Sequence, residues 1–114
     1  IAVVNYHRIK DQGGNIVPPK EIAKWTIENS ELPAMGLISD WAADGLPMAF
    51  GNSGFDTGIF VGERGAQILK GADAGTMPIV DPMQYEMTFN LSTIDKGDLS
   101  IPKSELDKAS ETFR

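Results

Sequence analysis

A short apolar run that breaks into a glycine-containing turn, and then into a helix, constrains this chain most. The run is Leu46–Phe50, the turn is Gly51–Gly54, and a helix is expected over Asp56–Lys70. In α/β proteins this order places a ligand at a strand end, because the glycines let backbone N–H groups approach it. The pattern predicts a binding site there without identifying what binds.

The rest of the chain alternates between strand and helix patterns. Further strands are expected over Ile1–Tyr6, Leu32–Ile38 and Tyr85–Leu91, from β-branched or alternating apolar residues. Further helices are expected over Lys20–Asn29, after two prolines, and after Pro102. The alternation predicts an α/β protein built from βαβ units with a mainly parallel sheet.

Details of these elements follow from the same patterns. Trp25, Tyr85 and Phe89 are expected in the core. Glycines weaken a helix, so Gly62 and Gly65 are expected to let their helix lie close to a sheet. The last helix is expected to have a capping-box pattern and an apolar stripe, formed by Ser104, Asp107, Leu106, Ala109 and Phe113.

Size and charge exclude several classes of function. The 114 residues make one domain or a piece of one, and the net charge of −6 provides no basic patch for nucleic acid. No apolar run is long enough to span a membrane. The chain opens without Met on what looks like a strand, which we interpret as a fragment of a longer protein whose N-terminal portion is missing.

The inventory of reactive side chains argues against catalysis. Cysteine is absent and His7 is the only histidine, so Cys–His catalysis and multi-His zinc sites are excluded. Neither Ser39 nor Ser53 lies in a G-x-S-x-G elbow. The spacing of Gly51, Gly54 and Gly58 matches no phosphate-binding loop. We therefore expect a protein that is not an enzyme and has neither a cofactor nor a bound metal.

The candidate binding residues lie next to strand ends. Asn52 and Ser53 are the best candidates for direct hydrogen bonds to a solute, and Asp56 suits a ligand ammonium group or caps its helix. Asp40 and Trp41 together suit a solute that carries an amine or a ring.

Two of these assignments have structural alternatives. In the structural alternative for the first pair, Trp41 packs under a loop and Asp40 caps the short turn that follows. His7 is a polar contact at a strand end or an ordinary surface histidine. Asp40 and Asp44 lack the ordered oxygen ligands of a known calcium site.

Four motifs, in order, resemble a known family. They are Gly62–Gly71 (GERGAQILKG), Met77–Pro82 (MPIVDP), Phe89–Leu91 (FNL) and Leu99–Pro102 (LSIP). Their order and spacing resemble the C-terminal part of the ABC-transporter substrate-binding protein family. The chain departs from the pattern at Gly97-Asp98, where the family usually has Leu-Gly.

The resemblance implies part of a two-lobed fold of the type I periplasmic-binding-protein kind, with a small molecule in the cleft between the lobes. It implies that residues 1–45 belong to the second lobe. Residues 46–78 would supply a hinge crossing and a helix of the first lobe, and residues 79–114 would return to the second lobe. The fragment would then need the missing lobe, or a second copy of itself, to cover its apolar faces.

The resemblance also implies a function. The chain would bind a small polar or amino-acid-like solute without catalysing a reaction. It would do so as the substrate-binding component of an ABC importer, with the permease as its partner. The alternative is the extracytoplasmic ligand-sensing domain of a membrane signalling receptor. Both imply a periplasmic or extracellular, membrane-associated location.

Overall fold

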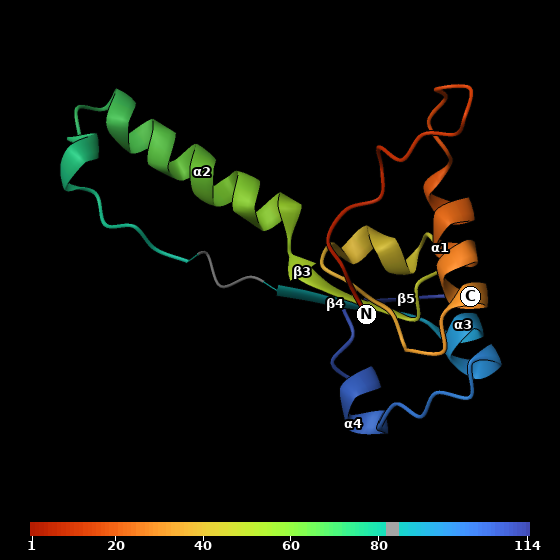
Figure 1. Ribbon diagram of the computed structural model, residues 1–114. Helices are drawn as coiled ribbons and strands as arrows, with labels where there is room; N and C mark the ends of the chain where they lie inside the picture. The colour runs from red at the N-terminus through yellow and green to blue at the C-terminus, as the bar shows by residue number, and fades with distance from the viewer. Residues whose placement is uncertain (82–84) are drawn as a thin grey trace. The chain divides into compact units, whose positions relative to one another are not determined.

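The computed structural model of this chain describes residues 1–81 and 85–114. The chain divides into two compact units, each described here by itself (Figure 1). The main unit is Ile1–Gly51 together with Glu86–Arg114, and the inserted unit is Asn52–Tyr85. Pro82, the last residue of the MPIVDP motif, lies outside the described residues.

A five-stranded sheet organises the main unit. Its strands lie in chain order: β1 (Ala2–Val3), β2 (Met35–Gly36), β3 (Met48–Asn52), β4 (Tyr85–Asn90) and β5 (Glu111–Phe113). The pairs β1–β2, β2–β3 and β4–β5 are parallel. The N–H of Asn90 donates to the carbonyl of Pro47 at 3.0 Å, so the end of β4 lies beside the start of β3. The predicted α/β class with a mainly parallel sheet is confirmed.

The helices of the main unit are short except for one. They are α1 (Pro19–Asn29), the 3₁₀ turn η1 (Ser39–Ala42), α3 (Leu91–Lys96) and α4 (Lys103–Leu106). Helix α1 begins at a proline, as predicted, because proline lacks an N–H that would be unpaired in the first turn anyway. The sequence patterns did not predict α3, which starts where Asn90 caps it by accepting from the N–H of Thr93 at 3.0 Å. Leu91 therefore opens a helix and does not end the preceding strand.

One apolar cluster forms the core of the main unit. Its buried members are Tyr6, Ala23, Ala34, Trp41, Ala42, Leu46 and Ala49. Gly36 is required beside Trp41, because a Cβ at this position would lie 2.8 Å from the Trp41 Cβ. Phe89 is fully buried, as predicted.

Several sequence predictions about the main unit are wrong. Strand β1 covers only Ala2–Val3 of the expected Ile1–Tyr6, and the side chain of Val4 is exposed. Strand β2 is likewise only Met35–Gly36. Trp25 is 65% exposed, because α1 directs Ala23 and not Trp25 into the core.

The end of the chain also differs from the prediction. Helix α4 ends at Leu106, its N-cap is Pro102 and not Ser104, and the chain then forms β5. Phe113 packs against the core cluster from this strand. Phe113 was expected on the apolar stripe of the last helix. It lies on strand β5 instead, which places its side chain against residues that a short helix could not reach.

The inserted unit consists mainly of α2 (Gly54–Leu69), followed by the 3₁₀ turn η2 (Ala74–Thr76). Ser53 caps α2, with its Oγ accepting from the Asp56 N–H at 3.2 Å, so Asp56 is not the cap as predicted. Gly71, which follows the C-cap of α2, has a left-handed backbone with φ of 100°, a conformation that glycine adopts readily. A Cβ at Gly62 or Gly65 would have no described atom within 4 Å outside its chain neighbours and its own helix backbone, and the predicted close approach to a sheet stays a prediction.

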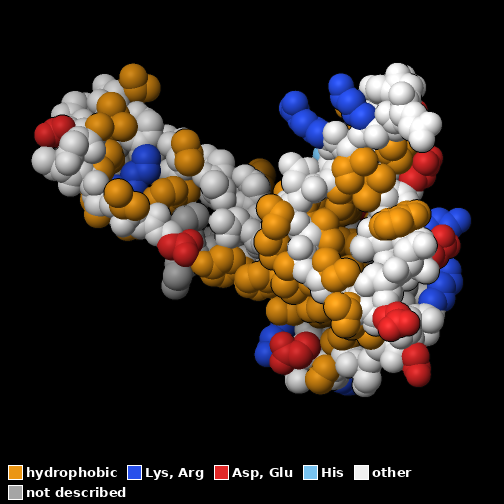
Figure 2. Space-filling view, in the orientation of Figure 1, with side chains coloured by type: hydrophobic (Ala, Val, Ile, Leu, Met, Phe, Trp, Pro, Cys, Tyr) orange, Lys and Arg blue, Asp and Glu red, His pale blue; other side chains and the backbone are white. Residues whose placement is uncertain are grey.

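Exposed apolar side chains occur on both units, and Figure 2 shows them as orange patches. None of the residues of α2 is buried, and Phe55 and Leu69 are 78% and 90% exposed. Tyr85, predicted in the core, is 47% exposed. In the described part of the chain, every helix is too short or too polar to cross a lipid bilayer.

Candidate functional site

A polar hollow of about 250 Å³ lies in the main unit where β2 ends and β4 and β5 begin. In open α/β sheets, ligands bind beyond the carboxyl ends of the parallel strands. The hollow lies at such an end for β2, whereas β4 and β5 begin there, because the end of β4 lies beside the start of β3. Seven residues line the hollow: Ser39, Asp40, Glu86, Thr88, Ser110, Glu111 and Phe113. We call it the carboxylate hollow.

Three of the lining residues carry negative charge. Asp40 and Glu111 are exposed and Glu86 is half-buried. Among the described residues, none of the three has an ion-pair partner. Their like charges add up over one small concave surface, which attracts a cation. The same described residues contain no group of three His, Cys, Asp or Glu side chains arranged to hold a metal ion.

Backbone and side-chain hydrogen bonds fix the rim of the hollow. Thr88, which is only 3% exposed, donates from Oγ1 to the carbonyl of Ser39 at 2.7 Å. Ser110 accepts from the Met87 N–H at 3.2 Å and donates its own N–H to the Met87 carbonyl at 2.8 Å. The turn that carries Asp40 and the start of β5 are therefore both held by β4.

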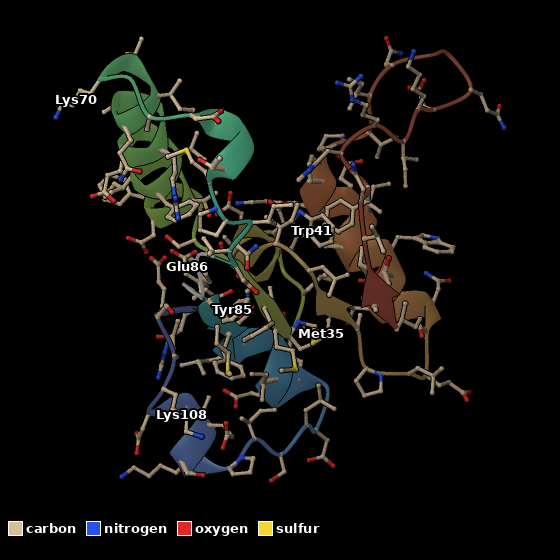
Figure 3. The ribbon with its side chains drawn as sticks, turned by 90° about the vertical axis from the view of Figure 1, so that its left-hand side faces the viewer. Met35, Trp41, Lys70, Tyr85, Glu86 and Lys108 are labelled. Carbon is tan, nitrogen blue, oxygen red and sulfur yellow. The ribbon has the colours of Figure 1, made fainter. Side chains whose placement is uncertain are left out.

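Trp41, the neighbour of Asp40, lies in the interior of the main unit. Its side chain is fully buried and its ring stacks on Tyr6, with centroids 4.8 Å apart. Figure 3 labels it together with Glu86. The ring therefore lies where the packing alternative places it, and contact between Trp41 and a solute stays a prediction.

His7 lies beside this pair. Its ring meets that of Trp41 edge-on, with centroids 5.7 Å apart. The Nε2 atom of His7 is 3.7 Å from Oδ2 of Asp44, and the backbone N–H of His7 donates to Oδ1 of Asn5 at 2.9 Å. The structure thus brings two of the predicted site residues, His7 and Trp41, into one cluster with Tyr6 and Asp44.

The phenol of Tyr6 has a perturbed pKa. Burial raises it, and the negative charge of Asp44 raises it further above the ordinary value of 10.0. A raised pKa in the folded state means that folding favours the protonated phenol. This contribution to stability is complete below the ordinary pKa and is lost as the pH rises above it.

We therefore expect the free energy of unfolding to fall as the pH rises above about 10, and the Tyr6→Phe variant to show a smaller fall. Urea titrations at several pH values measure this difference. Tyr85→Phe is the comparison variant. A hydrogen bond to Asp81 raises the pKa of Tyr85 as well, but this phenol is exposed to solvent, so its removal should change the pH profile less than Tyr6→Phe. Equal pH profiles for the wild type and Tyr6→Phe would contradict the assignment.

The other predicted site residues belong to the inserted unit. Asn52 ends β3 and is exposed, and Ser53 is the N-cap of α2, with its Oγ accepting from the backbone N–H of Asp56. The predicted residues thus divide between the units, with His7, Asp40 and Trp41 in the main one.

Sequence reasoning missed most of the carboxylate hollow. Glu86 and Thr88 do carry a signal, since they alternate with apolar residues on the predicted strand and so share one of its faces. Glu111 carries none, because its segment was expected to be helical. Its position follows only from the pairing of β5 with β4.

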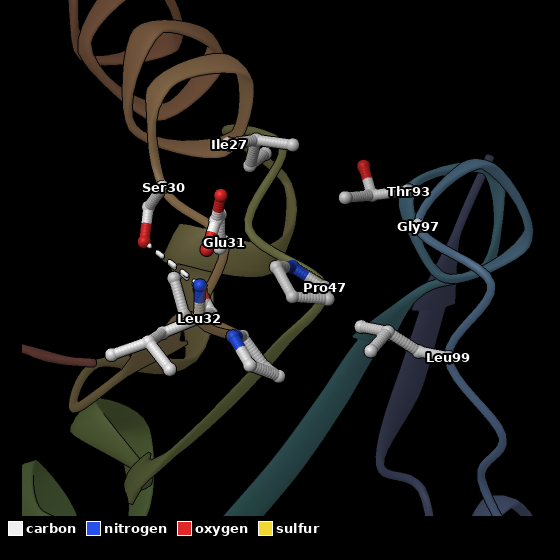
Figure 4. Close-up of a pocket in the computed structure, with 10 residues that line it drawn as sticks. Ile27, Ser30, Glu31, Leu32, Pro47, Thr93, Gly97 and Leu99 are labelled. Carbon is white, nitrogen blue, oxygen red and sulfur yellow. Dashed lines mark hydrogen bonds between the residues drawn. The ribbon is translucent and has the colours of Figure 1, made fainter.

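A second hollow, of about 100 Å³, lies at the opposite ends of the strands (Figure 4). Ala34 and Pro47, which precede β2 and β3, help to line it. Leu32 donates its N–H to Ser30 Oγ at 3.1 Å on its wall. It lies at the amino ends of β2 and β3 and beyond the end of β4, and its smaller volume makes it a poorer candidate for solute binding.

Comparisons with known proteins find similar structures but no similar sequence. No protein-family model matches the chain, and no curated protein matches it. An ABC domain in complex with L-Trp from Streptococcus pneumoniae superimposes with a TM-score of 0.67 over 81% of this chain. A ligand-free, open substrate-binding protein with adhesive properties from Clostridium difficile gives 0.62 over 84%. A conserved domain protein from Vibrio cholerae gives 0.62 over 72%.

Each of these three structures is 20% identical to the chain in sequence, so the likeness concerns the fold. The chain spans 28% to 32% of their lengths. It therefore matches a portion of such a protein, as the motifs imply. Over the matched residues, the chain has the α/β fold of substrate-binding proteins.

Proposed function

We propose that the chain is part of a non-enzymatic solute-binding protein, and that its carboxylate hollow contacts a small solute that carries an amine. The observation that carries the proposal is the set of three carboxylates without cationic partners among the described residues, at the carboxyl end of β2. The fold of the similar substrate-binding proteins supports the same role.

The chemistry of the hollow favours an ammonium group over an anion or an apolar ligand. Asp40, Glu86 and Glu111 would repel a phosphate or a free carboxylate but attract a cation. The hydroxyls of Ser39 and Ser110 add polar groups that can orient a ligand. The hollow is smaller than a typical pocket for drug-sized molecules, which begins at about 300 Å³. A simple amine fits these requirements, and an amino acid fits them with its ammonium group in the hollow and its carboxylate directed away from the three acidic side chains; one similar structure holds L-Trp.

The wider role follows from the resemblance to substrate-binding proteins. We propose that the whole protein works outside the cytoplasm as the substrate-binding component of an ABC importer, and that it delivers its solute to a membrane permease. Residues 1–45 and 79–114 would then belong to one lobe, and residues 46–78 would lead into the other. The exposed apolar residues of α2 would be covered by the rest of the protein or by a second copy.

We expect Asp40→Ala and Glu111→Ala in the full-length protein to weaken solute binding at least several-fold, because each removes a negative charge from the carboxylate hollow. Isothermal titration calorimetry with each of the twenty amino acids first identifies the tightest ligand, and the variants are then titrated with it. Native mass spectrometry of protein purified without refolding gives an independent identification of the solute.

Glu21→Gln is the matched control, because it removes one negative charge from α1, away from the hollow. It should bind like the wild type. Unchanged affinity of both Asp40→Ala and Glu111→Ala would overturn the site, and absence of binding by any amino acid or amine would overturn the proposed function.

A further inference from the structure

Three side chains that follow one another along β4 and α3 donate to three backbone carbonyls of the η1 segment, residues 39–45. Each donor is 48 or 49 residues from its acceptor in the sequence, so these are tertiary contacts. We call the set the carbonyl ladder. Its pairs are Thr88 Oγ1 to Ser39 O at 2.7 Å, Asn90 Nδ2 to Ala42 O at 2.9 Å, and Thr93 Oγ1 to Gly45 O at 2.8 Å.

The acceptors of the ladder are spaced by three residues, the period of the 3₁₀ turn η1. The segment satisfies part of its own carbonyls, since the Gly45 N–H donates to the Ala42 carbonyl at 3.2 Å. Strand β4 and the helix after it add a side-chain donor to each of the three carbonyls. The η1 segment is therefore held in place by specific tertiary hydrogen bonds as well as by the burial of Trp41.

We infer that Thr88 is a positioning residue for Asp40, an inference that rests on the proposed function of the carboxylate hollow. Its hydroxyl holds the carbonyl of the residue directly before Asp40. Thr88 also lies two residues after Glu86 on the same strand, so both residues project to one face of β4. The hydrogen bond thus fixes the Asp40 backbone relative to the strand that carries Glu86. The side chain is 3% exposed, so water cannot readily replace it as the donor.

Two substitutions at this position separate the hydrogen bond from the shape of the side chain. Thr88→Val keeps the volume and branching but removes the donor, and Thr88→Ser restores the hydroxyl. Thr112→Val is the matched control, because Thr112 is exposed on the neighbouring strand β5, opposite Phe89. Thr93→Val provides a second test at the other end of the ladder.

Amide hydrogen exchange in the full chain reads out the position of the η1 segment without any solute. The N–H groups of Trp41, Asp44, Gly45 and Leu46 donate within the segment or to the residue before it and serve as reporters. In Thr88→Val we expect these amides to exchange about tenfold faster, because a buried carbonyl loses its partner. Thr88→Ser should exchange close to the wild-type rate and Thr112→Val at the wild-type rate. Thr93→Val should accelerate amide hydrogen exchange most at the N–H groups of Gly45 and Leu46.

The outcomes separate this inference from the proposed function. Faster exchange confined to the η1 segment, restored by Thr88→Ser and accompanied by at least several-fold weaker binding of the tightest amino acid, supports the inference. Unchanged exchange in Thr88→Val, or equal acceleration in all parts of the protein, overturns it, since Thr88 would then have no role or only a general structural one. If wild-type protein binds no amino acid or amine, the proposed function fails, and the positioning role of Thr88 for a solute site fails with it even where exchange is faster. If the wild type binds and Thr88→Val changes neither exchange nor affinity, only the inference fails.

Discussion

Replacement of Trp41 with alanine should destabilise the main unit by about 3 to 5 kcal/mol, the usual cost of removing a large aromatic side chain from a core. Trp41 is fully buried, stacks on Tyr6 at 4.8 Å and packs against Gly36, where no larger residue fits. Its neighbours belong to different parts of the chain and cannot easily close the resulting cavity. Urea or thermal unfolding, followed by circular dichroism, measures the loss.

The second tryptophan provides the control. Trp25 is 65% exposed on α1, so Trp25→Ala should change the free energy of unfolding by no more than about 1 kcal/mol. Both variants lose the same atoms, and the difference between them reports burial alone. If Trp41→Ala were as stable as Trp25→Ala and lost only solute affinity, the assignment of Trp41 to the core would be wrong.

Asn90→Ala should cost about 1.5 to 2.5 kcal/mol, because this one side chain serves two backbone partners. Its Nδ2 donates to the carbonyl of Ala42, which also accepts the Gly45 N–H at 3.2 Å, and its Oδ1 accepts from the first turn of α3. The loss of a cap typically costs about 1 kcal/mol, and the loss of one tertiary hydrogen bond costs about 0.5 to 1.5 kcal/mol more. Chemical denaturation gives the sum.

Two further variants divide this sum. Asn90→Ser keeps a capping oxygen for α3 but has no amide donor for the Ala42 carbonyl, so its stability should fall between wild type and Asn90→Ala. Asn29→Ala removes a similar donor, which bonds to the Trp25 carbonyl, from an exposed position and should cost no more than about 0.5 kcal/mol. An effect of Asn90→Ala as small as that of Asn29→Ala would show that neither the cap nor the hydrogen bond to Ala42 contributes appreciably to stability.

Local patterns were sufficient for the class of the fold. The β-branched runs and the proline before α1 predicted the parallel sheet and the start of that helix, because these signals depend on neighbours along the chain. The last strand was missed for the opposite reason. Phe113 has helical spacing from Leu106 and Ala109, but its burial is decided by β4 and the core, which are distant in sequence.

The candidate site shows the same division. Asp40 could be proposed from its place after a strand, and it does line the carboxylate hollow. Glu111 could not, because only the pairing of β5 with β4 brings it there. The two tryptophans make the point for the core. The neighbours of each tryptophan along the chain do not indicate which of the two tryptophans is buried. Trp41 is buried because Gly36 leaves room for its side chain and Tyr6 stacks on its ring.

The spacing of the carbonyl ladder limits how this protein can change. Its three acceptors stand at residues 39, 42 and 45. Insertion or deletion of one residue between two of these acceptors would shift the next carbonyl along the segment. A side-chain donor on β4 or α3 would then lose its acceptor. The length of this loop is therefore constrained, whereas its outward side chains are free to vary. A new solute preference would be reached more readily by substitution at Asp40 than by insertion or deletion.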